Sequence, residues 1–438
     1  MAAAKTVEHM SPERLRVAER AKRDPGGCLT ALARLIDEAA LRRAFDRVRE
    51  DAAVGVDGVT KDEYGSNLEG HLQQLHERLR SQHYRHQPIR RVHIPKEAGK
   101  TRPIGVSAIE DKVVQGAIRE VLELVYEPVF LDCSYGFRPG RSAHDALRAV
   151  NRMLYRREAT WIIEADIVSY FDSIDRELLK EMIRARVADE SLLRLIGKCL
   201  RVGILNGEER SEPEKGAVQG SSLSPLLGNV YLHHVLDAWL ARDVQPKLRG
   251  RMQVVRYADD FVIGFEREDD ARRVMEVLGK RFEKFGLRLH PEKTRLFQFR
   301  RPRDGESKAD EATPFDFLGF TVITRRSHRG GWAVCFQTRK ARQRRAVWSI
   351  SEWCRRHRHL PTAAQHATLC RKLNGHLNYF AVSGNNRRIA ALCDRARSLW
   401  FKWLRRRGQR RPLTWERFLG LTARYPLPKP TVRATLWA

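Results

Sequence analysis

Residues 254–265 read Val-Val-Arg-Tyr-Ala-Asp-Asp-Phe-Val-Ile-Gly-Phe. Two adjacent aspartates, Asp259 and Asp260, stand between two apolar runs, a pattern typical of two short buried strands joined by a tight turn. Burying an unpaired carboxylate is costly, so such a pair needs protons, hydrogen bonds or a cation to neutralise it. A hard divalent cation bound through carboxylate oxygens would meet this need. Because Asp also favours solvated turns, this stretch alone leaves both a metal site and an ordinary hairpin turn open.

A second acidic segment lies upstream. Residues 161–172 read Trp-Ile-Ile-Glu-Ala-Asp-Ile-Val-Ser-Tyr-Phe-Asp, an apolar strand pattern that ends in Asp166 and Asp172. Two strands that each deliver an aspartate can hold two metal ions between them, and such ions clamp the attacking and leaving oxygens of a phosphoryl transfer. Alternatively, Asp166 or Asp172 could cap the helix expected near residues 176–180.

Together the two segments resemble the palm of a reverse transcriptase, and the whole chain is similar to the bacterial group II intron-encoded reverse transcriptases, which are also maturases. Further motifs of that family follow in order: residues 55–60, 94–96 with 101–105, 134–142, 219–227, 289–294 and 315–320. One Tyr-Ala-Asp-Asp could arise by chance, whereas this many motifs in one order could not.

The resemblance implies an α+β fold of the right-hand polymerase type, with fingers and an antiparallel palm sheet followed by a helical thumb. Four regions are expected: an N-terminal extension (1–80), fingers and palm (81–325), a helical thumb or maturase domain (326–400), and a short basic tail that binds DNA or RNA (401–438). Within the third region, residues 373–380 resemble the maturase segment of the thumb.

The resemblance also implies the catalytic centre. Asp166, Asp259 and Asp260 would be the catalytic residues. With Ile167, they would form the metal-binding positions for two Mg²⁺ ions, which activate the primer 3′-oxygen and neutralise charge on the leaving pyrophosphate.

Five positions are expected to bind the incoming nucleotide. Lys96 and Arg102 flank a hairpin turn and would supply the cations that a triphosphate needs beyond its metal ions; a solvated basic hairpin is the alternative. Phe171 would be a steric gate, a ring in the space that a ribose 2′-OH needs, unless it is a plain core residue. Gln219 and Gly220 would form a backbone segment that a base pair can approach closely.

The charge of the chain is uneven. The 438 residues carry a net charge of +28, and residues 321–438 hold 27 Lys and Arg against three acids, a net +24 that leaves +4 for the rest. Such asymmetry indicates a phosphate-backbone partner. A membrane surface is disfavoured because the aromatic residues form no obvious amphipathic face. Two sets of residues are expected to bind nucleic acid. Lys293 resembles a primer-backbone contact, with an ordinary surface lysine as the alternative. The second set is the cluster Arg405, Arg406, Arg407, Arg410 and Arg411.

Four tryptophans, Trp348, Trp353, Trp400 and Trp403, are interleaved with the arginines of the C-terminal region. Aromatic rings among basic residues suit RNA backbones and unstacked bases. The same rings could form the core of a helical thumb, and we expect this for Trp348 and Trp353.

The composition excludes other classes of protein. No apolar run is long enough to cross a bilayer, and the N-terminus lacks the apolar core of a secretion signal. The seven cysteines include no Cys-x-x-Cys pair, which argues against a disulfide framework and against a zinc module. We therefore expect a ribonucleoprotein of the bacterial cytosol with no membrane partner.

The first interpretation is an RNA-directed DNA polymerase that binds its group II intron RNA, assists splicing and copies the intron into DNA by target-primed reverse transcription. Its partners would be intron RNA, an RNA template with a DNA primer, dNTPs and target DNA. Because no His-Asn-His nuclease motif is present, we expect it not to cut target DNA itself. The alternatives are an RNA-binding splicing cofactor with a vestigial polymerase and a domesticated reverse transcriptase with a host or defence role. The three aspartates argue against the former alternative and residues 373–380 against the latter.

Overall fold

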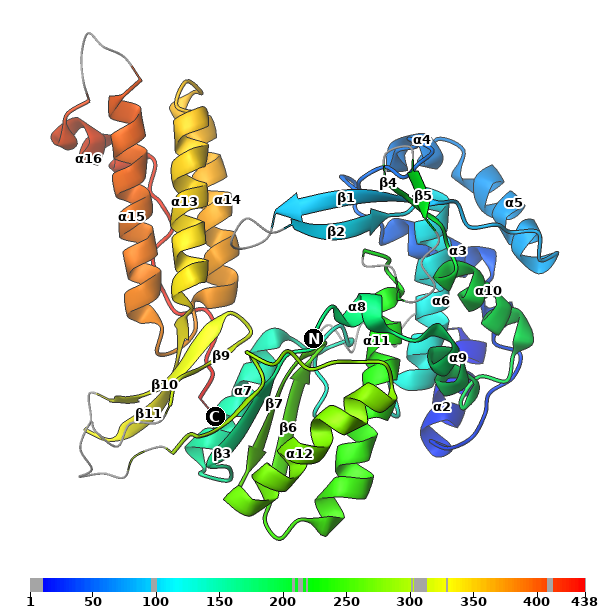
Figure 1. Ribbon diagram of the computed structural model, residues 1–438. Coiled ribbons are helices and arrows are strands. Elements are labelled where there is room, and N and C mark those ends of the chain that lie inside the picture. Colours follow the sequence, from blue (N-terminus) through cyan, green and yellow to red (C-terminus); the bar gives the residue numbers. More distant parts are fainter. Residues whose placement is uncertain are drawn as a thin grey trace.

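The computed structural model describes residues 11–95, 101–206, 209–211, 216–217, 220–300, 302, 313–327, 330–407 and 413–437. These residues form helices together with three sheets in which nearly all neighbouring strands are antiparallel (Figure 1). The mixed helix and antiparallel sheet content predicted from the sequence is confirmed. Among the described helices, none is both long and apolar enough to cross a membrane.

An N-terminal lobe is built around helix α6, whose apolar residues recur three and four positions apart and are buried along most of its length. The sheet of this lobe has the order β2-β1-β4-β5. The elements of the lobe are α2 (Pro12–Arg23), η1 (Ala33–Leu35), α3 (Glu38–Asp46), α4 (Lys61–Gly65), α5 (Leu68–Arg80), β1 (Ile89–Pro95), β2 (Thr101–Val106), α6 (Ile109–Tyr126), α9 (Arg176–Arg184), α10 (Glu190–Leu200), β4 (Ile204–Asn206) and β5 (Glu209–Ser211).

A central antiparallel sheet of order β6-β7-β3-β8 follows. Side chains alternate between its faces: Ile163 packs in one core cluster with α11 and α12, whereas Ile162 packs in another with α7. The elements of this part are α7 (Ala143–Tyr155), β3 (Trp161–Ala165), α8 (Tyr170–Ser173), α11 (Ser224–Leu232), η3 (His233–Asp237), η4 (Leu240–Val244), η5 (Gln245–Lys247), β6 (Met252–Tyr257), β7 (Asp260–Phe265), α12 (Glu268–Lys284) and β8 (Arg295–Gln298).

The C-terminal part begins with a third sheet, β11-β10-β9, and continues into a helical bundle formed by α13, α14 and α15. The bundle stands opposite the N-terminal lobe, across the central sheet (Figure 1). The bounds are β9 (Phe315–Phe317), β10 (Phe320–Arg326), β11 (Trp332–Thr338), α13 (Lys340–Arg356), α14 (Thr362–Phe380), α15 (Asn386–Arg405) and α16 (Trp415–Arg424). Two of the predicted boundaries, after residues 325 and 400, fall inside β10 and α15.

A buried carboxyl group connects α6 to the segment that leads into β1. Asp111 is 1% exposed; it accepts hydrogen bonds from the Tyr84 hydroxyl (2.6 Å) and from the Gln87 N–H (3.2 Å). Burial raises the pKa of Asp111 to about 7. His86 lies 3.3 Å from this carboxyl, but burial lowers its pKa, so the imidazole is neutral and does not compensate a charge on Asp111.

This carboxyl group predicts a pH dependence of stability. In the unfolded chain Asp111 loses its proton near pH 4, whereas the folded protein keeps it to about pH 7, so the folded state binds more protons between these values. The free energy of unfolding should therefore fall as pH rises through this window, by at most about 4 kcal/mol. Urea titrations of wild type and Asp111→Asn at about pH 5 and about pH 8 would measure it. The same pH slope in both proteins would contradict the prediction.

Candidate active site

The two adjacent aspartates lie where β6 turns into β7. Tyr257 pairs with Asp260, so Ala258 and Asp259 form a two-residue hairpin turn. Ala258 has a φ of +57°, the left-handed conformation that such turns require at their first position. A non-glycine residue is strained there, so the surrounding structure must hold the turn in place.

The strand register brings Asp166 to the same end of the sheet. In the antiparallel pair β3–β7, Ala165 is opposite Phe261, so the next residue on each strand is Asp166 and Asp260. Desolvation by the surrounding protein raises the pKa of Asp260 to about 7, and the negative charges of Asp259 and Asp166 contribute to this rise. Asp260 is nevertheless an exposed residue, so solvent screening weakens this effect. Three acidic residues from two strands thus share one electrostatic environment.

Lys293 partly compensates this negative charge. Its ammonium group forms an ion pair with the Asp166 carboxylate, and its positive charge opposes the rise in the pKa of Asp260. The His290 N–H donates to the Asp166 carbonyl (2.8 Å), which fixes the segment that carries Lys293 beside β3. The sequence suggested a primer contact for Lys293; its neighbour in this structure is a carboxylate.

The donor set suits a hard divalent cation in chemistry, because carboxylate oxygens are the ligands that Mg²⁺ prefers. Ile167, the fourth predicted metal-binding position, is buried and could contribute only its main-chain carbonyl. Among the described residues, no group of three or more His, Cys, Asp or Glu side chains has the geometry to hold a metal ion. The Asp166 carboxylate is held by Lys293 instead, so a cation would have to compete with that ammonium group.

A fully buried arginine supports the turn from behind. The Arg256 guanidinium donates to both oxygens of Asp237 (2.8 and 2.5 Å) and to the carbonyl of Ala258 (3.1 Å). Further bonds reach Asn229 Oδ1 (2.9 Å) and Ser134 Oγ (2.7 Å). Burial by itself would lower the pKa of Arg256, but the Asp237 carboxylate outweighs it and the pKa is raised.

The hydrogen bonds of Arg256 were not predicted from the sequence. The signal that could have revealed them is an arginine inside an apolar strand, since a buried charge needs a partner. The loop around Gly136 also packs against the turn. A Cβ at this position would lie 2.4 Å from the Ala258 nitrogen, so only glycine allows the loop to come this close to the turn.

Three of the five predicted nucleotide-binding residues are described. Arg102 is exposed on β2, in the hairpin that points toward the helical bundle (Figure 1). Phe171 is half-buried in α8, with its ring against Gly228 and 5.2 Å from the ring of Tyr170. Gly220 has a φ of +114°, and a Cβ there would meet the Gly105 carbonyl oxygen at 2.3 Å. Packing against β2 therefore requires this glycine, whatever its role toward a base pair. Lys96 and Gln219 lie outside the described residues.

Three arginines of the predicted C-terminal cluster are described, and they lie at the end of α15 or directly after it. Arg405, Arg406 and Arg407 are exposed; Arg406 stacks over Trp403 and Arg407 donates to the His359 carbonyl (3.0 Å). Arg410 and Arg411 lie outside the described residues.

The expectation for Trp348 was wrong, because this ring is 65% exposed on α13. Trp353 is half-buried and packs against the bundle core, as expected. Trp400 is fully buried and donates to Gln365 Oε1 (3.0 Å), so it belongs to the core.

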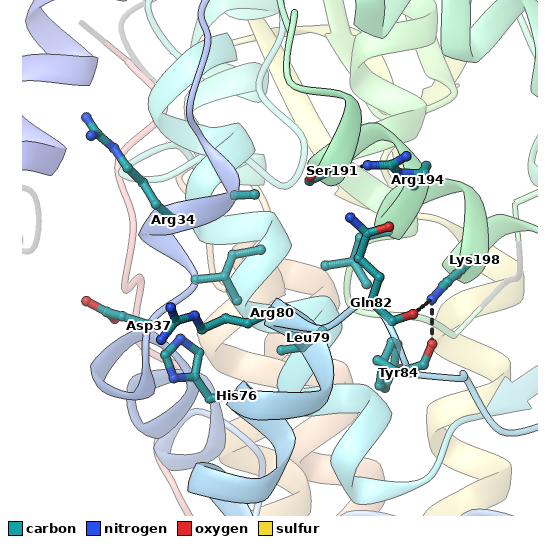
Figure 2. Close-up of a pocket in the computed structure, with 13 residues that line it drawn as sticks. Arg34, Asp37, His76, Leu79, Arg80, Gln82, Tyr84, Ser191, Arg194 and Lys198 are labelled. Atoms are coloured by element: carbon teal, nitrogen blue, oxygen red, sulfur yellow. Dashed lines mark hydrogen bonds between the residues drawn. The ribbon is translucent and has the colours of Figure 1, made fainter.

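Two pockets lie on the N-terminal lobe, and none of the three aspartates lines either of them. One pocket of about 480 Å³ is lined by Arg34, Arg80, Arg194 and Lys198 (Figure 2). Lys198 is fixed there by the carbonyls of Gln82 (2.8 Å) and Tyr84 (2.6 Å). A neighbouring pocket shares Arg194 and Lys198 and adds four cationic side chains: Arg85, Lys180, Arg184 and Arg201. The basic surface of the lobe is thus separate from the acidic centre.

Comparison with known families decides the classification. Residues 94–322 match the model of the reverse transcriptase (RNA-dependent DNA polymerase) family, which is more than half of the chain. The chain belongs to this family. All three aspartates lie within the matched range.

The individual relatives include two proteins that are named after introns. The chain is 35% identical over 314 residues to protein YkfC of Escherichia coli, covering 64% of this chain and 78% of that protein. It is 32% identical over 249 residues to the group II intron-encoded protein LtrA of Lactococcus lactis, covering 54% of this chain but 41% of LtrA. A shorter match of 122 residues, 34% identical, joins 28% of this chain to 15% of nuclear intron maturase 4 of Arabidopsis thaliana. The chain thus spans less than half of LtrA and of the plant maturase.

Proposed function

We propose that this reverse transcriptase polymerises DNA on an RNA template and that it also binds a group II intron RNA as a maturase. The observation that supports the polymerase activity is the register of β3 and β7, with Asp166 next to the Asp259–Asp260 turn. The match of residues 94–322 to the reverse transcriptase family also supports the polymerase activity. The names of LtrA and of the plant maturase support the intron role.

In this proposal Asp166, Asp259, Asp260 and the Ile167 carbonyl would hold two Mg²⁺ ions. Such ions would lower the pKa of the primer 3′-hydroxyl and neutralise charge on the leaving pyrophosphate. The protein holds the site in place, because Arg256 donates a hydrogen bond to the Ala258 carbonyl in the turn. Lys293 compensates the negative charge of Asp166 while no substrate is bound. Arg102, an exposed guanidinium on β2, is suited to a triphosphate because its donors match phosphate oxygens in pairs.

With the active site at the aspartates, the three parts of the fold can be assigned to the parts of a right-hand polymerase. The N-terminal lobe would be the N-terminal extension and fingers, the central sheet the palm, and the helical bundle the thumb. A duplex held between the bundle and the lobe would then reach the aspartates, which lie where β3 ends and β7 begins.

The RNA-binding part of the proposal depends on charge. Residues 321–438 carry a net +24, and the two pockets of the N-terminal lobe gather eight cationic side chains on a part of the chain that is close to neutral overall. Release of counterions from RNA would drive binding to both surfaces. Binding to intron RNA in particular is supported by the names of LtrA and of the plant maturase, and by residues 373–380, which resemble the maturase segment.

Primer extension tests the proposal. The purified protein should extend a DNA primer on an RNA template with dNTPs and Mg²⁺, and it should not do so when the cation is chelated. A protein that binds intron RNA tightly and promotes splicing, yet extends no primer, would support the alternative of a splicing cofactor with a vestigial polymerase.

Phe171 provides a sharper test of the nucleotide site. Phe171→Ala should raise ribonucleotide incorporation about 10–100-fold relative to wild type, because the space for a 2′-OH opens, while DNA synthesis persists. Competition between dNTP and rNTP in single-nucleotide addition measures this ratio. Phe171→Tyr is the matched control, since it keeps a ring at this position and should keep the discrimination. Unchanged sugar selection in Phe171→Ala would remove Phe171 from the nucleotide site.

A further inference from the structure

Residues 431–437, which we call the strap, run back from the helical bundle to the central sheet (Figure 1). They follow α16, which is itself packed on α15 through the fully buried Phe418 beside Trp400. The sequence placed these residues in a basic tail for DNA or RNA. In the structure the strap contacts two parts of the protein that are distant from each other in sequence, α14 and α7.

On the bundle side, the strap is tied to the end of α14. The Arg433 guanidinium donates to Asn374 Oδ1 (2.7 Å) and to Asn378 Oδ1. The Arg433 N–H donates to the Ala381 carbonyl (2.7 Å), and Ala434 forms a parallel bridge with Val382. Asn374 and Asn378 belong to residues 373–380, so part of the segment that resembles the maturase motif holds the strap.

On the sheet side, the strap is anchored in a hydrophobic core. Leu436 is 1% exposed and belongs to the core cluster of α7, the central sheet and the β9–β11 sheet. Its carbonyl accepts from Asn151 Nδ2 (3.0 Å), and the Thr435 carbonyl accepts from Arg148 Nε (2.9 Å); both donors lie on α7. The Leu436 N–H donates to Ser383 Oγ (3.0 Å).

We propose that Arg433 and Leu436 are positioning residues that set the angle of the helical bundle on the central sheet, and thereby how long the enzyme holds its template–primer duplex. The role rests on the proposed polymerase function. The strap adds a further tie between α7 and the end of α14. The other connections are the hydrogen bond between His144 Nε2 of α7 and the Tyr379 carbonyl of α14 (2.8 Å) and the continuation of β11 into α13. Because the duplex would lie between the bundle and the N-terminal lobe, a bundle held less firmly on the central sheet should release the duplex faster, without altering the chemistry at the aspartates.

The experiment uses the full-length protein and two variants, Leu436→Ala and Arg433→Gln, which loosen opposite ends of the strap. Amide hydrogen exchange at Ser383 and Leu436 should rise about tenfold or more in Leu436→Ala, because removing a buried leucine side chain favours local opening. Product length in a single binding event, measured with a trap for released enzyme, should fall severalfold in both variants. The rate of single-nucleotide addition to bound primer should stay within about twofold of wild type.

Trp437→Ala is the matched control, because Trp437 neighbours Leu436 but is 50% exposed; it should change none of the three measurements. Faster exchange with unchanged product length would overturn the positioning role and leave the polymerase intact. An equal loss of product length and of single-nucleotide addition would also overturn it, since the strap would then only stabilise the fold. Absence of nucleotide addition by wild type would reject the proposed function itself, and with it this role.

Discussion

Asp259→Ala is expected to lower primer extension at least about a thousandfold, because it removes a proposed ligand of the metal ions. A bound metal ion would contribute several kcal/mol of charge stabilisation in the transition state. Asp259 lies in the two-residue turn and is only half-buried, so its loss opens no large cavity. RNA affinity should stay unchanged, because the basic residues of the bundle and of the N-terminal lobe are not altered. The pKa of Asp260 should also fall toward its ordinary value, since the Asp259 charge helps to raise it.

Single-turnover primer extension and filter binding to RNA measure the two effects on the same protein. Asp62→Ala is a suitable control, because Asp62 is an exposed aspartate in the first turn of α4; it should extend primers like wild type. If Asp259→Ala extended primers at the wild-type rate, the assignment of the aspartates would be wrong. If extension and RNA affinity fell together, the variant would be misfolded, which circular dichroism would reveal.

The hairpin that carries the aspartates could be predicted because its information is local. Two apolar runs flank a short polar turn, and the strands β6 and β7 occupy the predicted stretch. The neighbourhood of Asp166 and Asp260, by contrast, depends on the pairing of β3 with β7, whose residues are about a hundred positions apart in the chain. Alternation of side chains predicts which face a residue takes, but not which strand becomes its neighbour.

The partners of charged residues could not be predicted for the same reason. Lys293 was expected to contact a primer, and its ion pair with Asp166 depends on a segment that returns beside β3. Trp348 and Trp400 show the same limit within the bundle. Both are tryptophans among arginines in the sequence, yet the first is exposed and the second is fully buried, because α15 faces the bundle core at Trp400.

Arg256→Met is expected to destabilise the protein by about 3–5 kcal/mol, because it leaves the Asp237 carboxylate buried without its partner. Both side chains of this ion pair are inaccessible to solvent. The midpoint of urea unfolding measures the loss. Primer extension should fall as well, since the Ala258 carbonyl in the strained turn loses the hydrogen bond that supports it.

A second variant separates the two consequences. Arg256→Met with Asp237→Leu removes both charges, and replacing a buried ion pair by apolar residues is often close to neutral for stability. The double variant should therefore regain most of the stability lost by Arg256→Met. It should not regain primer extension, because the bonds from Arg256 to Ala258 and Asn229 remain absent and the turn beside Asp259 is still unsupported. Full recovery of extension in the double variant would mean that Arg256 serves only to neutralise Asp237, and that the turn needs no support from it.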